Sequence, residues 1–515
     1  MKLLEASLEI KANLLLWIGV LTMLLVIFFK QRWKHRKIYK FMNAMSGPPS
    51  FPLIGSAYFA LKITDRNLCE VLREQMEKYP NGCYWIKNEP WFITGDPKVI
   101  SALLSSSQNI HKTQLYDYFE AHGSGIFCAN GDSWRKIRKT INPSFRTNVL
   151  KSFGASFSYH TETFIEKLNE FADGEKMVDL FAPVHLCTID FVCENMMGCR
   201  MEIQKRNMVF LSTNLEKSSE MIHTRIFNFL LQPDLIYTLL GKKKELQRLV
   251  QGMRDLAKEM IELRAKYREE TRLSNTNSEI VPIFMENLLN GVESGVISSE
   301  RAVDETVEMF IAGSITTATT AAWILKIFAQ RPEIQERVYK EIMEISNGQK
   351  ITLEDVSKLT YLEMVVKETL RHFGIPFVGR ALVEDLQVDE KMTIPAGVSV
   401  MPILFVLHHD PAFWEKPNEF HPEHFSQINE QKRPKGVFVP FLNGPRHCPG
   451  NKYAYQSVTY LIANTLLHYE FSSDEKAPVD IQNANYRILF MVWPLTGFRA
   501  KIRRRTNSPS NPQAG

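Results

Sequence analysis

The chain has 515 residues, of which 44% are hydrophobic and 11% aromatic, enough to bury a large core in one or two packed units. This composition excludes a disordered protein, and the formal net charge of +5 is too weak to indicate nucleic-acid binding. The seven cysteines are irregularly spaced and include no CxxC pair, which argues against a zinc cluster and indicates a reduced, cytosol-facing protein.

The N-terminal segment predicts a membrane anchor. Residues 12–29 carry no charge, and about 18 residues at 1.5 Å rise are enough to cross a hydrocarbon core. A basic run from Lys30 to Lys40 follows and would stay on the cytosolic side. The alternative is a cleaved signal peptide, whose positive charge would come before the apolar stretch. We therefore expect a retained anchor over residues 1–30.

Proline and polar residues mark the ends of the folded part. The stretch Gly47-Pro48-Pro49-Ser50-Phe51-Pro52 cannot be helical, because proline fixes φ and lacks the amide donor. We expect a basic, Pro-rich hinge over residues 31–56, one large domain over 57–502 and a disordered tail over 503–515, which is rich in Pro and Ser.

The interior predicts a mainly α fold with small β-sheets (α+β). Apolar residues recur at helical spacing in several long segments, and β-branched and aromatic residues mark short strands. Neither GxGxxG nor GxxxxGK occurs, so no nucleotide-binding motif is evident. The expected helices are 159–172, 244–268, 300–330, 332–346 and 361–372, and the expected strands lie within 82–95, 377–401 and 486–502.

Three short helical patterns follow one another along the chain. Trp134 and Arg138 form WxxxR, and residues 312–317 read Ala-Gly-Ser-Ile-Thr-Thr. Glu368 and Arg371 form ExxR. Residues three or four apart share a helix face, so each pair would act together. Alone, each pattern is also compatible with an ordinary amphipathic, Thr-rich or charged helix.

The most specific signal is the stretch Phe441-Leu442-Asn443-Gly444-Pro445-Arg446-His447-Cys448-Pro449-Gly450. It matches FxxGxRxCxG at all five fixed positions, a match expected by chance in roughly one chain in ten thousand. This pattern resembles the haem-binding signature of cytochromes P-450, and the alternative is a structural cysteine in a Gly/Pro turn. The resemblance covers roughly residues 30–502 and is greatest to the clan around family 4, through segments 134–138, 189–198 and 376–380.

The resemblance implies roles around a haem b cofactor. Cys448 would be the axial thiolate ligand, which favours O–O cleavage. Gly444 and Gly450 would let the backbone approach the haem face, and Phe441 would cover the sulfur. Arg446 would pair with a haem propionate.

The other motifs would support the haem. Trp134, Arg138 and Arg380 would bind the propionates, and Glu368 with Arg371 would form a buried structural ion pair. The segment 420–425 resembles the family's PERF segment, with His424 in place of the arginine. Because histidine cannot donate a bidentate fork, we expect a weaker network there.

The Ala312–Thr317 motif would activate oxygen. Gly313 would leave room for O₂, and Thr316, followed by Thr317, would steer protons to it. The motif departs from the family at two positions. Ile315 replaces the usual acid, which predicts an absent or rerouted proton path. Ala312 replaces the glutamate that esterifies the haem in many family 4 members, so we expect no covalent link.

Electrons must come from another protein, because the chain lacks a flavin or nicotinamide domain. The resemblance implies NADPH–cytochrome P-450 reductase, with cytochrome b5 as a further candidate donor. A basic patch would attract such an acidic partner, although an ordinary solvated surface would look the same. The patch would consist of Arg135, Lys136, Lys139, Lys432, Arg433, Lys435 and Lys452.

The leading hypothesis is a monooxygenase of the endoplasmic reticulum membrane, with a single N-terminal anchor and a cytosolic catalytic domain. The apolar stretch 226–240 would touch lipid and favours a hydrophobic substrate such as a fatty acid, terpenoid, sterol or xenobiotic. One alternative is a haem-thiolate isomerase or dehydratase that acts on a peroxide without a reductase. Another is a non-catalytic haem protein that binds a lipophile.

Overall fold

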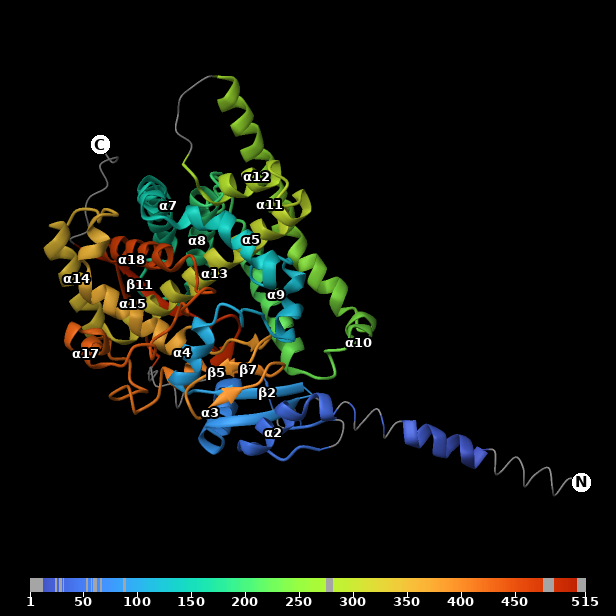
Figure 1. Cartoon of the computed structure of the whole chain (residues 1–515). Helices are drawn as coiled ribbons and strands as arrows, with labels where there is room; N and C mark the ends of the chain where they lie inside the picture. Colours follow the sequence, from blue (N-terminus) through green and yellow to red (C-terminus); the bar gives the residue numbers. More distant parts are fainter. Residues whose placement is uncertain are drawn as a thin grey trace, which may run out of the picture.

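The computed structural model describes residues 13–23, 26, 30, 32–51, 54–56, 58, 63–64, 67–86, 89–274, 281–475 and 486–506. Helices dominate it and small sheets lie to one side, which confirms the predicted fold class (Figure 1). The helices are α2 (Arg36–Ala44), α3 (Leu68–Lys78), α4 (Pro97–Ser105), α5 (Gly131–Ile141), α6 (Thr147–Lys151), α7 (Gly154–Leu168), α8 (Phe181–Asn195), α9 (Val209–Phe227), α10 (Asp234–Leu239), α11 (Lys242–Leu273), α12 (Phe284–Glu293), α13 (Ser299–Gln330), α14 (Pro332–Ser346), α15 (Thr360–Phe373), α16 (Leu404–Leu407), α17 (Gln427–Lys432) and α18 (Asn451–His468).

The long helix α13 forms the centre of the molecule. It packs against α8 along one side and against α11, α15 and α18 on others. Ser298 caps the first turn of α13 by accepting a hydrogen bond from the Arg301 amide. The helix ends just before Pro332, which begins α14. Its length and apolarity would suit a membrane span, but most of it is buried, so α13 is a core helix.

The largest sheet has four strands in the order β1-β2-β7-β4. Strand β2 pairs antiparallel with β1 and parallel with β7, and β4 pairs antiparallel with β7, which fixes Arg380 at the start of the short edge strand. The strands of this sheet are β1 (Asn81–Ile86), β2 (Glu89–Thr94), β4 (Arg380–Ala381) and β7 (Ser399–Pro402), and the smaller sheets contain β3 (Val178–Asp179) with β8 (Tyr469–Ser472) and β11 (Arg499–Arg504), β5 (Leu386–Gln387) with β6 (Thr393–Ile394), and β9 (Tyr486–Ile488) with β10 (Val492–Pro494).

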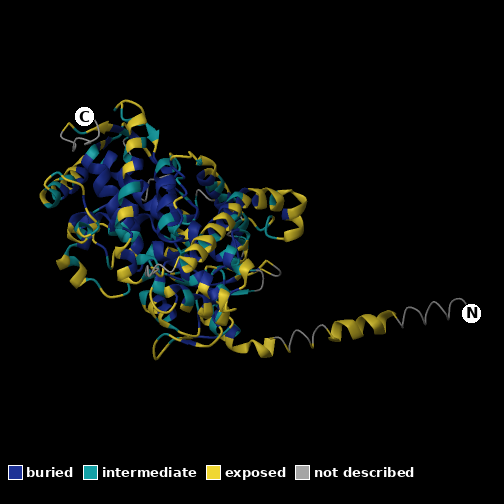
Figure 2. Ribbon diagram, turned by 90° about the horizontal axis from the view of Figure 1, so that it is seen from above, coloured by how far each residue is buried: buried dark blue, intermediate teal, exposed yellow. Residues whose placement is uncertain are grey.

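The N-terminal part differs in detail from the sequence-based expectation. The helix Asn13–Met23 is apolar and exposed, as Figure 2 shows, but it covers only part of the predicted anchor. Within the predicted hinge, Ile38 and Met42 of α2 are buried in a cluster with Phe92 and Val400 of the large sheet. This part of the hinge therefore belongs to the folded unit.

Candidate functional site

The loop that carries Cys448 leads directly into α18. The Cys448 amide donates a hydrogen bond to the Phe441 carbonyl at 2.9 Å, which closes the loop on itself. Burial raises the pKa of the Cys448 thiol, while the Gly450 amide and the Arg138 guanidinium act in the opposite direction. The sulfur thus lies beside two groups that favour its anionic form.

Gly444 is needed in this loop for a reason that the sequence did not indicate. Its φ is +72°, and a Cβ there would lie 1.9 Å from the Leu104 carbonyl oxygen at the end of α4. At Gly450 a Cβ would lie 3.9 Å from the Cys448 sulfur, an ordinary contact. Gly444 therefore lets the loop pack against α4, and the approach of both glycines to a haem face stays a prediction.

Three cationic side chains come together from separate parts of the fold, and a fourth lies beside Cys448. Arg380 of β4 and Arg446 of the cysteine loop are buried, and half-buried Lys112 lies near both of them and near Glu308. Arg138 of α5 is buried beside Cys448. Burial, then the charges of Arg380 and Arg446, lower the pKa of Lys112 well below its usual value. Within the described residues, none of these cations has a carboxylate within 4.0 Å.

Arg446 makes the most hydrogen bonds of these cations. Burial and the charge of Arg380 lower its pKa to about 9. Its guanidinium lies 5.2 Å from the centroid of the Trp134 ring. It donates hydrogen bonds to the carbonyl oxygens of Ile110, Ile126, Phe127 and Ala129 and to Asn130 Oδ1.

This cluster fits the carboxylates of a haem. Burying cations without a counter-charge is costly, and an anionic ligand would remove that cost. Arg138 links the Cys448 thiol to the buried cations. Its Nη2 lies 3.3 Å from His447 Nε2, and its charge acts to lower the Cys448 pKa. Sequence reasoning found three of the four cations and missed Lys112, which belongs to none of the motifs.

The Ala312–Thr317 motif presents one face of α13 and buries the other. Ala312 is exposed and Thr316 is half-buried, and the Thr316 hydroxyl donates to the Ala312 carbonyl at 2.7 Å. Thr317 is buried and donates to the Gly313 carbonyl at 2.8 Å. The structure therefore separates Thr316, which can reach a ligand, from Thr317, which faces the interior.

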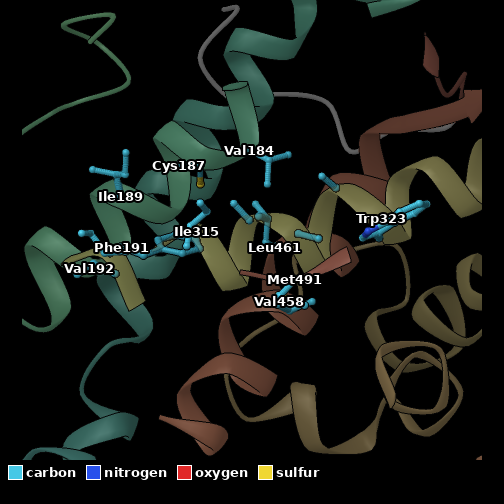
Figure 3. Packing of buried hydrophobic residues seen from close by; sticks show 14 of the residues in the cluster. Val184, Cys187, Ile189, Phe191, Val192, Ile315, Trp323, Val458, Leu461 and Met491 are labelled. Carbon is cyan, nitrogen blue, oxygen red and sulfur yellow. The ribbon is translucent and has the colours of Figure 1, made fainter. Parts of the chain in front are cut away.

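Gly313 and Ile315 contact α8. Figure 3 shows Ile315 among α8 side chains such as Val192, and Ile315 is only 1% exposed. A Cβ at Gly313 would lie 2.9 Å from Val192 Cγ2. Gly313 therefore allows the close approach of two helices, and the expectation that it makes room for O₂ stays a prediction.

Glu368 and Arg371 of α15 form a fully buried ion pair. Arg371 Nε and Nη2 donate to the two Glu368 oxygens at 2.8 and 2.7 Å. Arg371 also donates to three backbone carbonyls, those of His408, Pro417 and Glu419. The pair thus ties α15 to the segment that precedes the cysteine loop, and every donor has an acceptor, as buried charges require.

His424 completes this network from the PERF-like segment. Its Nδ1 lies 3.1 Å from Glu368 Oε1, and its Nε2 contacts the Glu415 carbonyl. Arg433 donates to the His424 carbonyl and stacks on Trp414 at 3.9 Å. Arg433 was expected in a solvent-exposed patch, but burial lowers its pKa to about 10, and it belongs to this network.

The remaining residues of the predicted basic patch are exposed. Arg135 pairs with Asp132 at 3.2 Å, and Lys452 donates to the Thr147 hydroxyl at 3.3 Å. The exposed members are Arg135, Lys136, Lys139, Lys432, Lys435 and Lys452.

Rings from three elements form an aromatic cluster near the start of α13. Phe119 of the 3-10 helix η2 (Gln114–Ala121) lies 5.5 Å from Phe127 and 5.4 Å from Phe490 in the turn between β9 and β10. His223 of α9 meets Phe119 edge-on at 5.6 Å. Burial lowers the pKa of His223 to about 4, so its ring is neutral at pH 7. The cluster is largely apolar, but His122 lies 6.1 Å from Phe490 and the Lys112 ammonium lies 4.8 Å from the centroid of the Phe127 ring.

Comparison with known proteins agrees with the site geometry. The family model described as cytochrome P450 matches residues 45–496. Cytochrome P450 4c21 of Blattella germanica is 28% identical over 471 residues, covering 89% of this chain and 93% of its own. Cytochrome P450 4V2 of Homo sapiens is 28% identical over 472 residues, covering 88% and 89%. The chain therefore belongs to the cytochrome P450 family, in the clan around family 4, and is an oxidoreductase of the haem-thiolate monooxygenase type.

Proposed function

We propose that this protein inserts one oxygen atom from O₂ into a hydrophobic substrate, using electrons from NADPH through a separate reductase. The observation that carries the proposal is the arrangement of the Cys448 thiol beside buried cations that have no carboxylate partner among the described residues. A porphyrin with two propionates supplies the missing negative charge, and Cys448 supplies its thiolate ligand.

Haem b would be held by Cys448, with Arg138, Arg380 and Arg446 at its propionates. Trp134 supports this set by packing under Arg446. When bound, the haem supplies the oxidising chemistry, and the thiolate favours O–O cleavage. The Ala312 side chain is only a methyl group and cannot form an ester, so we expect no covalent link to the haem.

Thr316 is the residue that would handle protons. Its hydroxyl now donates to the Ala312 carbonyl and can rotate to donate toward a ligand on the open face of α13. Ile315 cannot relay a proton and is buried against α8. Proton delivery to Thr316 would therefore depend on water, and turnover would be less tightly coupled to NADPH use.

The aromatic cluster favours a lipophilic substrate. Phe119, Phe127 and Phe490 supply apolar surface from three separate elements, and Phe127 is 36% exposed. Phe377, after α15, contacts Phe227 at the end of α9 and forms a second aromatic pair. Transfer of an apolar molecule to such walls is favourable at about 25 cal/mol per Å² of buried area.

Exposed leucines favour entry of such a substrate from a membrane. Four leucines in and around α10 are strongly exposed, between 58% and 77%. Exposed leucines on one short segment suit contact with lipid rather than water. Together with the anchor expected over residues 12–29, they favour a cytosolic domain resting on the endoplasmic reticulum membrane. The leucines are Leu230, Leu235, Leu239 and Leu240.

The redox partner would dock on the cysteine-loop side. Lys435 and Lys452 are exposed on the segments that flank the loop, and Lys136 and Lys139 are exposed on α5. An acidic partner would be steered to this surface, with an on-rate that falls as salt rises. NADPH–cytochrome P450 reductase is the proposed partner, and cytochrome b5 could use the same surface.

Reconstitution tests the proposal. Purified holoprotein, reductase, lipid and NADPH are incubated with candidate lipophiles, and products are analysed for oxygen from ¹⁸O₂. Incorporation of one labelled atom that requires NADPH and reductase supports a monooxygenase. Ile315 favours a second candidate, a haem-thiolate isomerase or dehydratase. Conversion of a lipid hydroperoxide without NADPH, and no labelled product with it, would select that alternative.

A further inference from the structure

Glu308 is a buried acid that the family motifs do not explain. It lies on α13 one helical turn before Ala312 and two turns before Thr316, so all three share a face. Eight residues correspond to about 12 Å along the helix axis. The face of α13 that carries Ala312 and Thr316 therefore continues toward the N-terminus of the helix and becomes buried where it reaches this carboxyl group.

One oxygen of this carboxyl has a partner and the other has none. Oε2 accepts a hydrogen bond from the Phe127 amide at 2.6 Å, and Gly125 leaves it space, because a Cβ there would lie 2.5 Å away. Oε1 is buried and has no hydrogen-bond partner in the described part of the chain, and Glu308 as a whole is only 6% exposed. Such a buried, unpaired oxygen is costly unless a ligand pairs with it.

The environment makes Oε1 a hydrogen-bond donor. Burial and the neighbouring Glu305 raise the pKa of Glu308 to about 8, so the group carries a proton at pH 7. Because Oε2 accepts an amide, the proton belongs on Oε1. The other charged or titratable groups that face Glu308 are Arg301 of α13, Lys112 and Cys128 of the loop that covers it, and Arg446.

These neighbours decide which ligand group suits the site. The two cations Lys112 and Arg446 disfavour an ammonium group, and Lys112 already lies over the Tyr116 ring at 3.8 Å. The exposed Phe127 ring, next to the amide that Glu308 holds, offers an apolar wall. A neutral oxygen acceptor on a largely apolar molecule meets both conditions.

We propose that Glu308 anchors the substrate by donating a hydrogen bond from Oε1 to a carbonyl, ether or hydroxyl oxygen. The inference rests on the proposed function, because it names a chemical class within the hydrophobic substrates. It assigns Glu308 to substrate positioning and leaves the oxidation to the haem and Thr316.

Binding of two matched probes tests the proposal. The ketone 2-acetylnaphthalene and its hydrocarbon isostere 2-isopropenylnaphthalene are titrated into the holoprotein, and Kd is measured by calorimetry and by the haem spin-state shift. At pH 7 we expect the ketone to bind about tenfold more tightly. At pH 9, where Glu308 is ionised, we expect that preference to fall to threefold or less.

Three variants separate anchoring from support of the loop. Glu308→Leu should bind both probes equally. Glu308→Gln keeps an N–H donor and an acceptor for Phe127, so its preference should persist and be independent of pH. Asp304→Asn is the matched control, because Asp304 holds the Ser124 amide of the same loop at 3.3 Å and its other oxygen is paired with Arg254 at 2.7 Å. It should retain the wild-type preference and its pH dependence.

Several results would overturn the inference. They are equal affinities of the wild type for both probes, an unchanged ketone preference in Glu308→Leu, or the same loss in Asp304→Asn. If Glu308→Leu does not fold, a ketone preference that depends on pH in Glu308→Gln would also contradict the inference. Tight binding of both probes without discrimination would contradict only the role of Glu308, whereas binding of neither would also contradict the proposed lipophilic site.

Discussion

Glu308 and Arg446 form hydrogen bonds with the two backbone polar groups of the same residue, Phe127. The Phe127 amide donates to Glu308 at 2.6 Å, and its carbonyl accepts from Arg446 Nη2 at 3.2 Å. The neighbouring residue repeats the arrangement, since the Ile126 amide donates to Glu305 at 2.9 Å and its carbonyl accepts from Arg446 at 3.3 Å. One short loop thus connects the acids of α13 with the cation two residues before Cys448.

The buried carboxyl of Glu308 predicts a stability that depends on pH. The folded protein retains its proton up to a pKa of about 8, whereas the unfolded chain releases it near 4.5. Between these values the folded state binds the extra proton, so this contribution to stability is greatest below pH 4.5 and is lost as pH rises to 8, by about 1.4 kcal/mol per pH unit at most. Thermal unfolding of wild type and Glu308→Gln at pH 5, 6, 7 and 8 should show the variant gaining relative stability with pH. A constant difference would contradict the buried neutral acid.

Breaking the Glu368–Arg371 pair should strongly destabilise the protein. Glu368→Gln leaves a buried guanidinium without its counter-charge, which costs about 3–5 kcal/mol. We expect a large fall in the unfolding free energy, measured with denaturant, and a loss of bound haem. Glu363→Gln is the control on the same helix, because Glu363 is half-exposed and pairs with Lys367 at the surface. It should cost less than about 1 kcal/mol. Equal effects of the two variants would argue against a structural role for the pair.

Gly444→Ala should disrupt the cysteine loop. The new Cβ would lie 1.9 Å from the Leu104 carbonyl oxygen, in addition to the strain of φ +72°. Gly295 has the same φ, but nothing lies within 4 Å of its Cβ position, so Gly295→Ala measures the strain alone. We expect about 1 kcal/mol for Gly295→Ala and at least 3 kcal/mol for Gly444→Ala. Similar losses, with normal haem content in both, would show that the packing of Gly444 on α4 is unimportant.

Replacing Ile315 by the acid that the family usually carries should not simply restore proton delivery. Ile315 is 1% exposed and packs in the hydrophobic core, so Ile315→Asp would bury a carboxyl without a partner. We expect a loss of several kcal/mol of stability, whereas Ile315→Val should lose only about 1 kcal/mol. An Ile315→Asp protein as stable as wild type, with tighter coupling of NADPH use to product, would show that the position can serve as a proton relay.

Local spacing explains what the sequence predicted. WxxxR and ExxR place two residues on one face of a helix, and the structure buries Trp134 with Arg138 and Glu368 with Arg371. Which side chain Gly313 contacts depends instead on where α8 lies against α13, and no local pattern specifies that packing. The contacts of Glu308 with Phe127, 181 residues apart, likewise depend on the path of a long loop. Lys112 and Glu308 were missed for this reason.

The role of Cys448 is the centre of this account, and the spectrum of the reduced, carbon-monoxide-bound protein tests it most directly. Wild type should show the absorption band typical of thiolate ligation. Cys448→Ala should lose that band together with NADPH-dependent turnover. Cys187→Ala is the control, because Cys187 is a fully buried cysteine whose thiol donates to the His160 carbonyl of α7, and this variant should keep the band. Retention of the thiolate band and of activity in Cys448→Ala would contradict the assignment.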